Sequence, residues 1–205
     1  MTNRSDTNNF NNDSDIRKTS VIKERVSLIS SHMYKQFLEH QNATENTKEM
    51  FYNLWKESEN VVLSLKESFA ARSLSSEHIS SELEIERTAF VVNILWHFIT
   101  FKMRCNQKPQ ALQREMDAPL FSGRIIALNG NFNNKNIKES DYPEILEHEI
   151  ASLYVPADKN KNCIIKIKHI GNREFPINHI DAPKEFMLKV IEIICGGGIY
   201  HEELF

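Results

Sequence analysis

Apolar residues recur at steps of three and four through the first third of the chain. Residues from about 20 to 40 contain one such stripe, which is made by Ile22, Val26, Ile29, Met33 and Phe37. After a polar break at 41–44 the spacing returns and runs to about 71, with the stripe Phe51, Leu54, Trp55, Val61, Val62, Leu65 and Phe69. Such spacing places the apolar residues on one face of a helix. The pattern predicts two helices, the second capped by Thr44 or Thr47.

A third helix is predicted after the break at 73–76, running to about Met103. Its pattern is mixed at first and then apolar almost all round from 90 to 101, in the run FVVNILWHFITF. A helix that is apolar on every side is normally covered on every side. We therefore expect this helix to be the central element of the fold.

The periodicity changes after a linker at about 106–120, which contains two prolines. The continuous apolar run at 125–128 ends in Asn129-Gly130, a dipeptide that favours strand reversal. Further strands are predicted at about 150–155, 163–170 and 175–177. The last is expected at a sheet edge, because it contains Pro176 and proline cannot donate to a ladder.

Two more helices are predicted in this second half. A short one precedes the strand at 150–155, because Asp141 and Glu144 form a capping pair around Pro143. The last helix begins at Asp181 and stops at Gly196, where we expect a left-handed conformation. Residues 1–18 are too polar to offset their chain entropy by burial, so a disordered arm is predicted there.

These elements together predict an α+β protein. A helical N-terminal half packs with a small antiparallel sheet of three or four strands and a C-terminal helix. The expected division is an arm at 1–18 and one domain at 19–205. That domain consists of a helical half at about 19–105, the linker at 106–120, the sheet and last helix at 121–195, and a tail at 196–205.

Composition narrows the classes of function. The net charge of −3 and the pI near 6.3 provide no general basic field for nucleic acid. The most apolar stretch, 89–101, is shorter than the roughly 20 residues of a membrane span. The three cysteines, at 105, 163 and 195, have no zinc-ligand or redox spacing. We expect reduced thiols in a cytoplasmic protein without direct membrane insertion.

Candidate chemistry is weak along the whole chain. His148-Glu149 resembles the start of a zinc-protease helix, but position 152 is Ser rather than the second His. The glycines at 196–198 follow a helix, whereas a phosphate loop precedes one. We therefore predict no catalytic residue, no metal and no cofactor. The alternative is a small enzyme whose site is assembled from distant residues, around His97 or Cys105.

Charge is distributed unevenly along the second half. An acidic run contains Glu139, Asp141, Glu144, Glu147 and Glu149, and a basic segment contains Lys159, Lys161, Lys166, Lys168 and Arg173. Both are predicted to be solvated faces, because surface charge mainly keeps proteins soluble. The alternative is a charged docking patch on an inhibitor or immunity-type protein.

Aromatic residues indicate where a partner would bind. Phe51, Tyr52 and Trp55 lie within about one helical turn, and one helix face rarely buries all of them. The tail adds Tyr200, Leu204 and Phe205 near a chain end. Exposed aromatic clusters are frequent binding hot spots, so these six residues are the predicted partner-binding residues. The alternative is an ordinary core with a tail packed on its own domain.

Three segments carry a family resemblance: the Asn-rich start MTNRSDTNNF, the aromatic run FVVNILWHFITF and the ending GGGIYHEELF. Together with the α+β character they resemble the LvgA-type adaptors of type IVB (Dot/Icm) secretion systems. The resemblance implies a non-catalytic virulence adaptor or chaperone in a heteromeric complex. It would bind the coupling ATPase tail beside small acidic chaperones, recruit secreted effectors, and reach the inner face of the membrane through that complex. The resemblance supplies no functional residue.

Overall fold

The structure, a computed structural model, describes residues 9–84, 87–107, 121–132, 142–168 and 173–196. The chain divides into two compact units, Met1–Leu38 and Glu39–Phe205. The boundary falls inside a single long helix, α1 (Asn9–Ala71). The sequence predicts one domain from 19 to 205, and this stays a prediction. The helix also begins within the segment 1–18, for which the sequence predicts a disordered arm, and residues 1–8 lie outside the described residues.

α1 is one helix where the polar break at 41–44 predicts two. Thr44 Oγ1 donates to the carbonyl oxygen of His40 at 2.9 Å, and Thr47 Oγ1 donates to that of Ala43. A capping hydroxyl would accept from free amides at a helix start. Here the hydroxyls bond back to the preceding turn, which leaves the helix continuous. The predicted break is therefore wrong.

The second unit contains a seven-stranded antiparallel sheet, rather than the three or four strands predicted. Each strand pairs with the next one along the chain. The strands are β1 (Ile79–Leu83), β2 (Ala89–Ile94), β3 (His97–Gln107), β4 (Ser122–Asn129), β5 (Glu149–Pro156), β6 (Cys163–Ile167) and β7 (Arg173–Ile177). β4, β5, β6 and the edge strand β7 confirm the four strand predictions in outline. The linker prediction falls largely on 108–120, outside the described residues.

The predicted third helix is instead β1, β2 and the first part of β3. A continuous apolar run cannot distinguish a buried helix from buried strands by its period. The run is rich in β-branched side chains, which favour strands. Ile94 pairs with His97, and Leu95 begins the turn between them with a φ of 59°. Positive φ in this place is typical of a tight hairpin turn.

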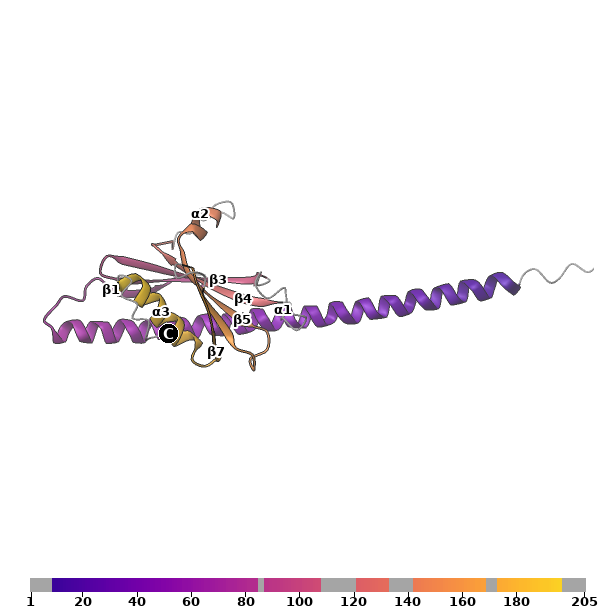
Figure 1. Cartoon of the computed structure of the whole chain (residues 1–205), viewed down its shortest axis with the longest axis horizontal. Helices are drawn as coiled ribbons and strands as arrows, with labels where there is room; N and C mark the ends of the chain where they lie inside the picture. The colour runs from indigo at the N-terminus through magenta and orange to yellow at the C-terminus, as the bar shows by residue number, and fades with distance from the viewer. Residues whose placement is uncertain (1–8, 85–86, 108–120, 133–141, 169–172, 197–205) are drawn as a thin grey trace, which may run out of the picture. The chain divides into compact units, whose positions relative to one another are not determined.

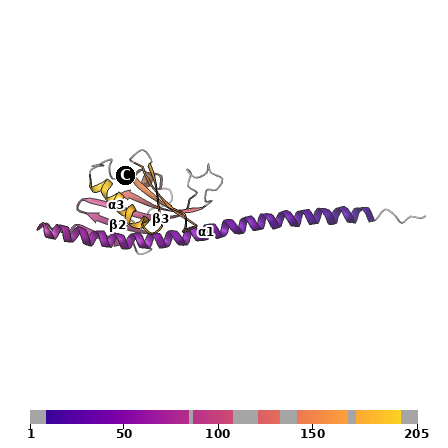
Figure 2. The ribbon, with the colours of Figure 1, turned by 60° about the horizontal axis from the view of Figure 1, so that its bottom comes forward.

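One face of the sheet forms the main core against two helices. The 39–71 part of α1 and the C-terminal helix α3 (Ala182–Cys195) cover this face (Figures 1 and 2). A chain of ring contacts crosses it: Phe51 on Phe90 at 5.3 Å, Phe90 on Phe101 at 4.8 Å, and Phe101 on Phe186 at 6.0 Å. All four rings are buried, so the helices and the sheet share one apolar core.

The opposite face has a smaller apolar cluster. Neighbouring strand residues point to opposite faces, so Ile125 joins the main core while Ile126 and Leu128 pack with Ile145 of α2 (Tyr142–Glu147). Figure 1 shows α2 on the side of the sheet away from α1. The short helix predicted before β5 is confirmed. Its capping pair, Asp141 and Glu144, lies outside the described side chains.

α3 agrees with its prediction at the start and differs at the end. Asp181 occupies the N-cap position but makes no side-chain capping hydrogen bond, and Pro183 lies in the first turn. The Asp181 carboxylate accepts from Asn178 Nδ2 at 2.6 Å. Gly196 ends the helix with a φ of −77°, which is right-handed, so the predicted left-handed stop is wrong. Among the described residues, no helix has the length and apolar character needed to cross a membrane.

Candidate functional site

A groove of about 480 Å³ lies beside the middle of α1 in the second unit. Its walls come from α1, β1, β3 and the segment that follows β1. The lining residues are Lys48, Phe51, Tyr52, Trp55, Leu83, Arg87, Thr88 and Met103. The volume is within the range of about 300–1,000 Å³ that is usual for ligand pockets.

The α1 wall is aromatic because three rings project from consecutive turns. Phe51 is 4% exposed and belongs to the core, whereas Tyr52 is 48% exposed. Trp55 is half-buried, and its ring centroid lies 6.1 Å from that of Tyr52. Lys56 Nζ lies 4.6 Å from the Tyr52 ring centroid and holds a cation over its face. The floor of the groove is thus continuous with the core, while its rim is open to solvent.

The second wall comes from residues far along the chain. Leu83 ends β1 and Met103 lies in β3, and both side chains pack on the main core. Thr88 Oγ1 donates to Glu84 at 3.4 Å. Arg87 is exposed and adopts a φ of 55°. Among the described residues, the charged side chains that line the groove are Arg87 and Lys48, and both are cationic.

One polar atom inside the aromatic wall lacks a partner. Trp55 Nε1 is buried and makes no hydrogen bond to any described residue. A buried indole N–H usually has an acceptor, because leaving a donor unpaired costs free energy. The groove therefore has apolar walls and two border cations, and Trp55 Nε1 is buried beside it. That combination suits a bulky apolar group with a neighbouring negative charge.

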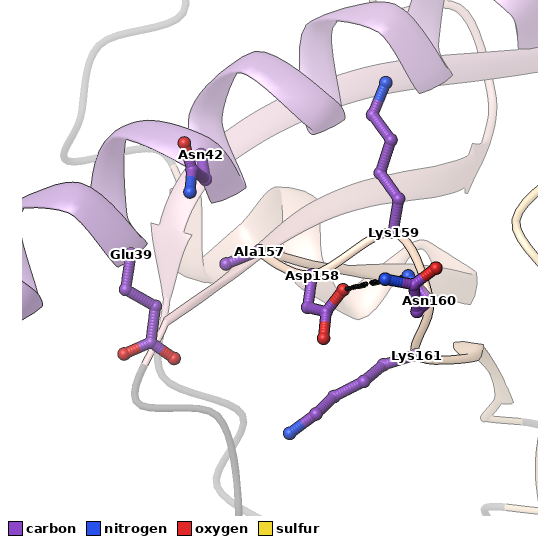
Figure 3. A pocket seen from close by; sticks show the side chains of 7 residues that line it. All are labelled: Glu39, Asn42, Ala157, Asp158, Lys159, Asn160 and Lys161. Carbon is purple, nitrogen blue, oxygen red and sulfur yellow. Dashed lines mark hydrogen bonds between the residues drawn. The ribbon is translucent and has the colours of Figure 1, made fainter.

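A second, more polar hollow of about 400 Å³ lies between α1 and the β5–β6 loop (Figure 3). It is lined by Glu39, Asn42, Ala157, Asp158, Lys159, Asn160 and Lys161. Asp158 Oδ1 accepts from the backbone N–H of Asn160 at 3.0 Å and from its side-chain amide at 3.1 Å. These bonds form the ordinary side-chain-to-backbone turn of an Asp-initiated loop. They explain the loop without a ligand.

Lys159 at this loop is paired rather than free. Its Nζ contacts the Glu49 carboxylate at 2.5 Å, and this hydrogen bond lowers the pKa of Glu49. Burial lowers the pKa of nearby His179, and the charge of Lys159 lowers it further. The basic segment is neutralised at other points too, since Lys166 pairs with Glu174 and Lys168 with Glu149. These pairs reduce the net positive charge of the segment. They therefore weaken the alternative hypothesis that the segment is a charged docking patch.

Glu149 contradicts the prediction that the whole acidic run is solvated. Its side chain is 2% exposed, and it pairs with Arg124 and with Lys168, whose Nζ lies 2.9 Å from Oε2. Ser152 Oγ also donates to it. Burial raises the pKa of Glu149, but these hydrogen bonds and cations outweigh burial and hold its pKa below the usual value. Sequence spacing did not reveal this network, because Arg124 comes from another strand.

The structure brings together three of the six predicted partner-binding residues, since Phe51, Tyr52 and Trp55 all line the groove. Tyr200, Leu204 and Phe205 lie outside the described residues. Sequence analysis missed Lys48, Leu83, Arg87, Thr88 and Met103. Helical spacing places Lys48 four residues before Tyr52 on α1 and could have indicated it. Linear spacing contains no signal for the other four, because they approach α1 only in the folded sheet.

The residues weighed for enzyme chemistry are dispersed. His97 begins β3, half-buried, with its ring 5.6 Å from that of Trp96. His148 is exposed and lies 5.1 Å from the Phe132 ring. Burial raises the pKa of Cys163 to about 12, and the Cys105 side chain lies outside the described residues. Three or more metal-ligating side chains do not gather anywhere in the described part of the chain.

Comparison with known proteins adds no relative to this picture. No protein-family model, no curated protein and no solved structure matches the chain.

Proposed function

We propose that the protein is a non-catalytic adaptor that binds other proteins, and that the groove beside Trp55 receives a segment of its partner. The observation that carries the proposal is the groove itself. It combines open aromatic walls, two border cations and an indole N–H without a partner. Exposed Tyr and Trp side chains beside a buried core are frequent hot spots of protein interfaces.

The groove chemistry suggests what the partner segment contains. A bulky apolar side chain would fill the space between Trp55, Leu83 and Met103. An acidic residue next to the apolar one would lie near Lys48 and Arg87, where opposite charge fixes the orientation of binding. We infer a short segment with an apolar residue beside Asp or Glu.

The resemblance to LvgA-type adaptors suggests the setting. In a type IVB secretion system the partners would be the coupling ATPase tail, small acidic chaperones and secreted effectors, with the protein on the cytoplasmic side of the membrane. The tail residues Tyr200, Leu204 and Phe205 would provide a second contact. This setting rests on the resemblance, whereas the binding role rests on the groove.

Partner capture tests the binding role. Tagged full-length protein is compared with Tyr52→Ala and Trp55→Ala, and with the matched control Trp96→Ala, whose ring is 75% exposed on the β2–β3 turn outside the groove. Proteins captured from native lysate are quantified by mass spectrometry. We expect one set of partners to be lost from both groove variants and kept by Trp96→Ala. Equal capture by all four proteins would contradict the use of this groove.

Trp fluorescence gives a direct readout of groove occupancy. The chain has two tryptophans, so Trp96→Phe leaves Trp55 as the single reporter. The anionic apolar dye 1-anilinonaphthalene-8-sulfonate should bind the native groove and accept energy from Trp55. The double variant Lys48→Glu/Arg87→Glu should weaken that binding at least tenfold, about 1.4 kcal/mol. If the affinity for the dye is unchanged in the double variant, the dye binds elsewhere and the support for a cationic border is removed.

A further inference from the structure

The first unit has an apolar seam that the groove proposal does not use. We define the seam as Ile22, Val26, Ile29, Met33 and Phe37 of α1. Each of these side chains is between 57% and 62% exposed. Exposed apolar residues scattered singly need no explanation, but a contiguous apolar surface marks an interaction site.

The spacing of the seam is that of a coiled coil. Its steps are four, three, four and four residues, and the first four residues follow the alternation of the two core positions of a heptad. At about 100° per residue, all five fall within an arc of about 80°. The same apolar spacing continues in the second unit, where Met50 and Leu54 are buried against the sheet. A narrow seam of this kind fits one neighbouring helix.

The charged residues beside the seam indicate which kind of partner helix it would bind. Residues 21–38 contain Lys23, Arg25 and Lys35 and a single acidic residue, Glu24, in a chain whose net charge is −3. Lys23 and Arg25 lie about 40° outside the two borders of the seam, one on each side, at 100° per residue. These border positions decide which helices pair in a coiled coil. In a parallel pair, a second copy would bring its own Lys23 and Arg25 to both borders, and like charges there oppose pairing.

We propose that the seam binds one helix of a partner protein, whose own apolar seam is bordered by Asp or Glu. The two helices pack knobs-into-holes along residues 22–37, and Lys23 and Arg25 pair with the acidic borders. The seam shares no residue with the groove. A membrane surface would favour a wider apolar face than this 80° arc.

Synthetic peptides test the choice of partner. The probe is a fluorescein-labelled 21-residue helix with Ile and Leu at the core positions and Glu at every border position. Its twin has Lys at the same border positions. Full-length protein should bind the Glu peptide at least tenfold more tightly than the Lys peptide, measured by fluorescence anisotropy. The difference should shrink as NaCl rises from about 50 mM to 500 mM, because salt screens exposed charges.

Matched variants assign the binding to the seam. Ile29→Gln/Met33→Gln should weaken Glu-peptide binding at least tenfold, whereas Leu28→Gln should leave it unchanged, since Leu28 is 65% exposed but lies outside the seam. Lys23→Glu/Arg25→Glu should reverse the preference towards the Lys peptide. Trp55→Ala should bind as the wild type does, so failure here is separable from failure of the groove proposal. Circular dichroism checks that each variant keeps its helix content.

Three results would overturn the proposal. Equal affinity for both peptides, or no binding of either, would contradict the proposal of a partner helix with acidic borders. Sedimentation equilibrium that shows a dimer lost in Ile29→Gln/Met33→Gln makes a second copy the occupant. Binding to phosphatidylserine-containing vesicles, with loss on the same substitutions and no peptide preference, makes a membrane the occupant.

Discussion

The buried carboxylate of Glu149 shows how a single position departs from its sequence context. It lies in an acidic run that the sequence predicts to be solvated, yet Arg124, Lys168 and Ser152 surround it. A buried carboxylate is stable only when it is paired and hydrogen-bonded. The network therefore makes this face of the sheet depend on Glu149 being ionised.

Replacing Glu149 by Gln should lower the free energy of unfolding by about 3 kcal/mol at pH 7, because it removes the buried carboxylate that pairs with the largely buried Arg124. The pKa of Glu149 is lowered in the folded state, so the stabilisation is complete above the unfolded pKa. It is lost as pH falls through the folded value. Urea unfolding from pH 7 to pH 3 should show wild type and variant converging at the acidic end.

Glu174→Gln is the matched control, because Glu174 also pairs with a lysine but is 38% exposed. An exposed pair contributes about 0–1 kcal/mol, so this variant should remain close to wild type throughout. Equal effects of the two substitutions would show that the Glu149 network is solvated rather than buried.

At the scale of elements, α1 and the sheet approach too closely for a side chain at one point. A Cβ on Gly123 of β4 would lie 1.5 Å from Thr47 Oγ1 and 2.6 Å from Thr47 Cβ. The absence of a side chain at 123 leaves room for the Thr47 side chain of α1 against β4. This glycine is required by contact between two elements rather than by its own backbone angles.

Gly123→Ala should therefore cost about 1–3 kcal/mol, the usual range for overpacked cores. Adding Thr47→Gly should restore part of the loss, because it removes the atoms in the way. A double-mutant cycle by urea unfolding measures the coupling. Simple additivity of the two costs would mean that 47 and 123 do not touch.

In the hairpin of β2 and β3, two phenylalanines differ in burial, whereas the predicted central helix would bury both. Phe101 is fully buried between Phe90 and Phe186, so Phe101→Ala should cost about 3–5 kcal/mol. Phe98 is 39% exposed, and Phe98→Ala should cost less than about 1 kcal/mol. If residues 77–103 formed a central helix, Phe98→Ala would also cost several kcal/mol. Thermal unfolding of both variants distinguishes the two structures.

At the scale of the whole molecule, the chain consists of two units joined within one helix. The second unit contains the main core, the groove and the sheet. The first contributes an exposed seam. A unit with its own core can fold alone, whereas an exposed helical segment gains most of its burial from a partner.

Removing residues 1–38 should change the melting temperature of the remaining chain by only a few degrees, because the deleted side chains from 21 onward are largely exposed. Calorimetry should still show one cooperative transition, and dye binding to the groove should persist. Removing residues 1–55 should abolish the transition, because it deletes Phe51 and Leu54 from the core. Loss of cooperative folding in the shorter deletion would contradict the division at 38.

What the sequence determined by itself is local. The stripes of α1, the position of β6, the edge strand β7 with its proline and the position of α3 follow from spacing and backbone preference over a few residues. Those predictions are confirmed because nothing distant competes with them. The aromatic cluster of Phe51, Tyr52 and Trp55 was also visible as a pattern, although not the groove that contains it.

Tertiary structure decided the rest, because the deciding contacts join residues far apart in the chain. The apolar run 90–101 is compatible with helix or strand, and its pairing with β1 and β4 makes it two strands. Thr44 and Thr47 can cap or continue a helix, and the sheet that buries Thr47 favours continuation. The groove needs Leu83 and Met103 beside α1, and Glu149 needs Arg124 from the neighbouring strand. No local pattern encodes these long-range contacts, because the free energy that favours them comes from burial across the whole sheet.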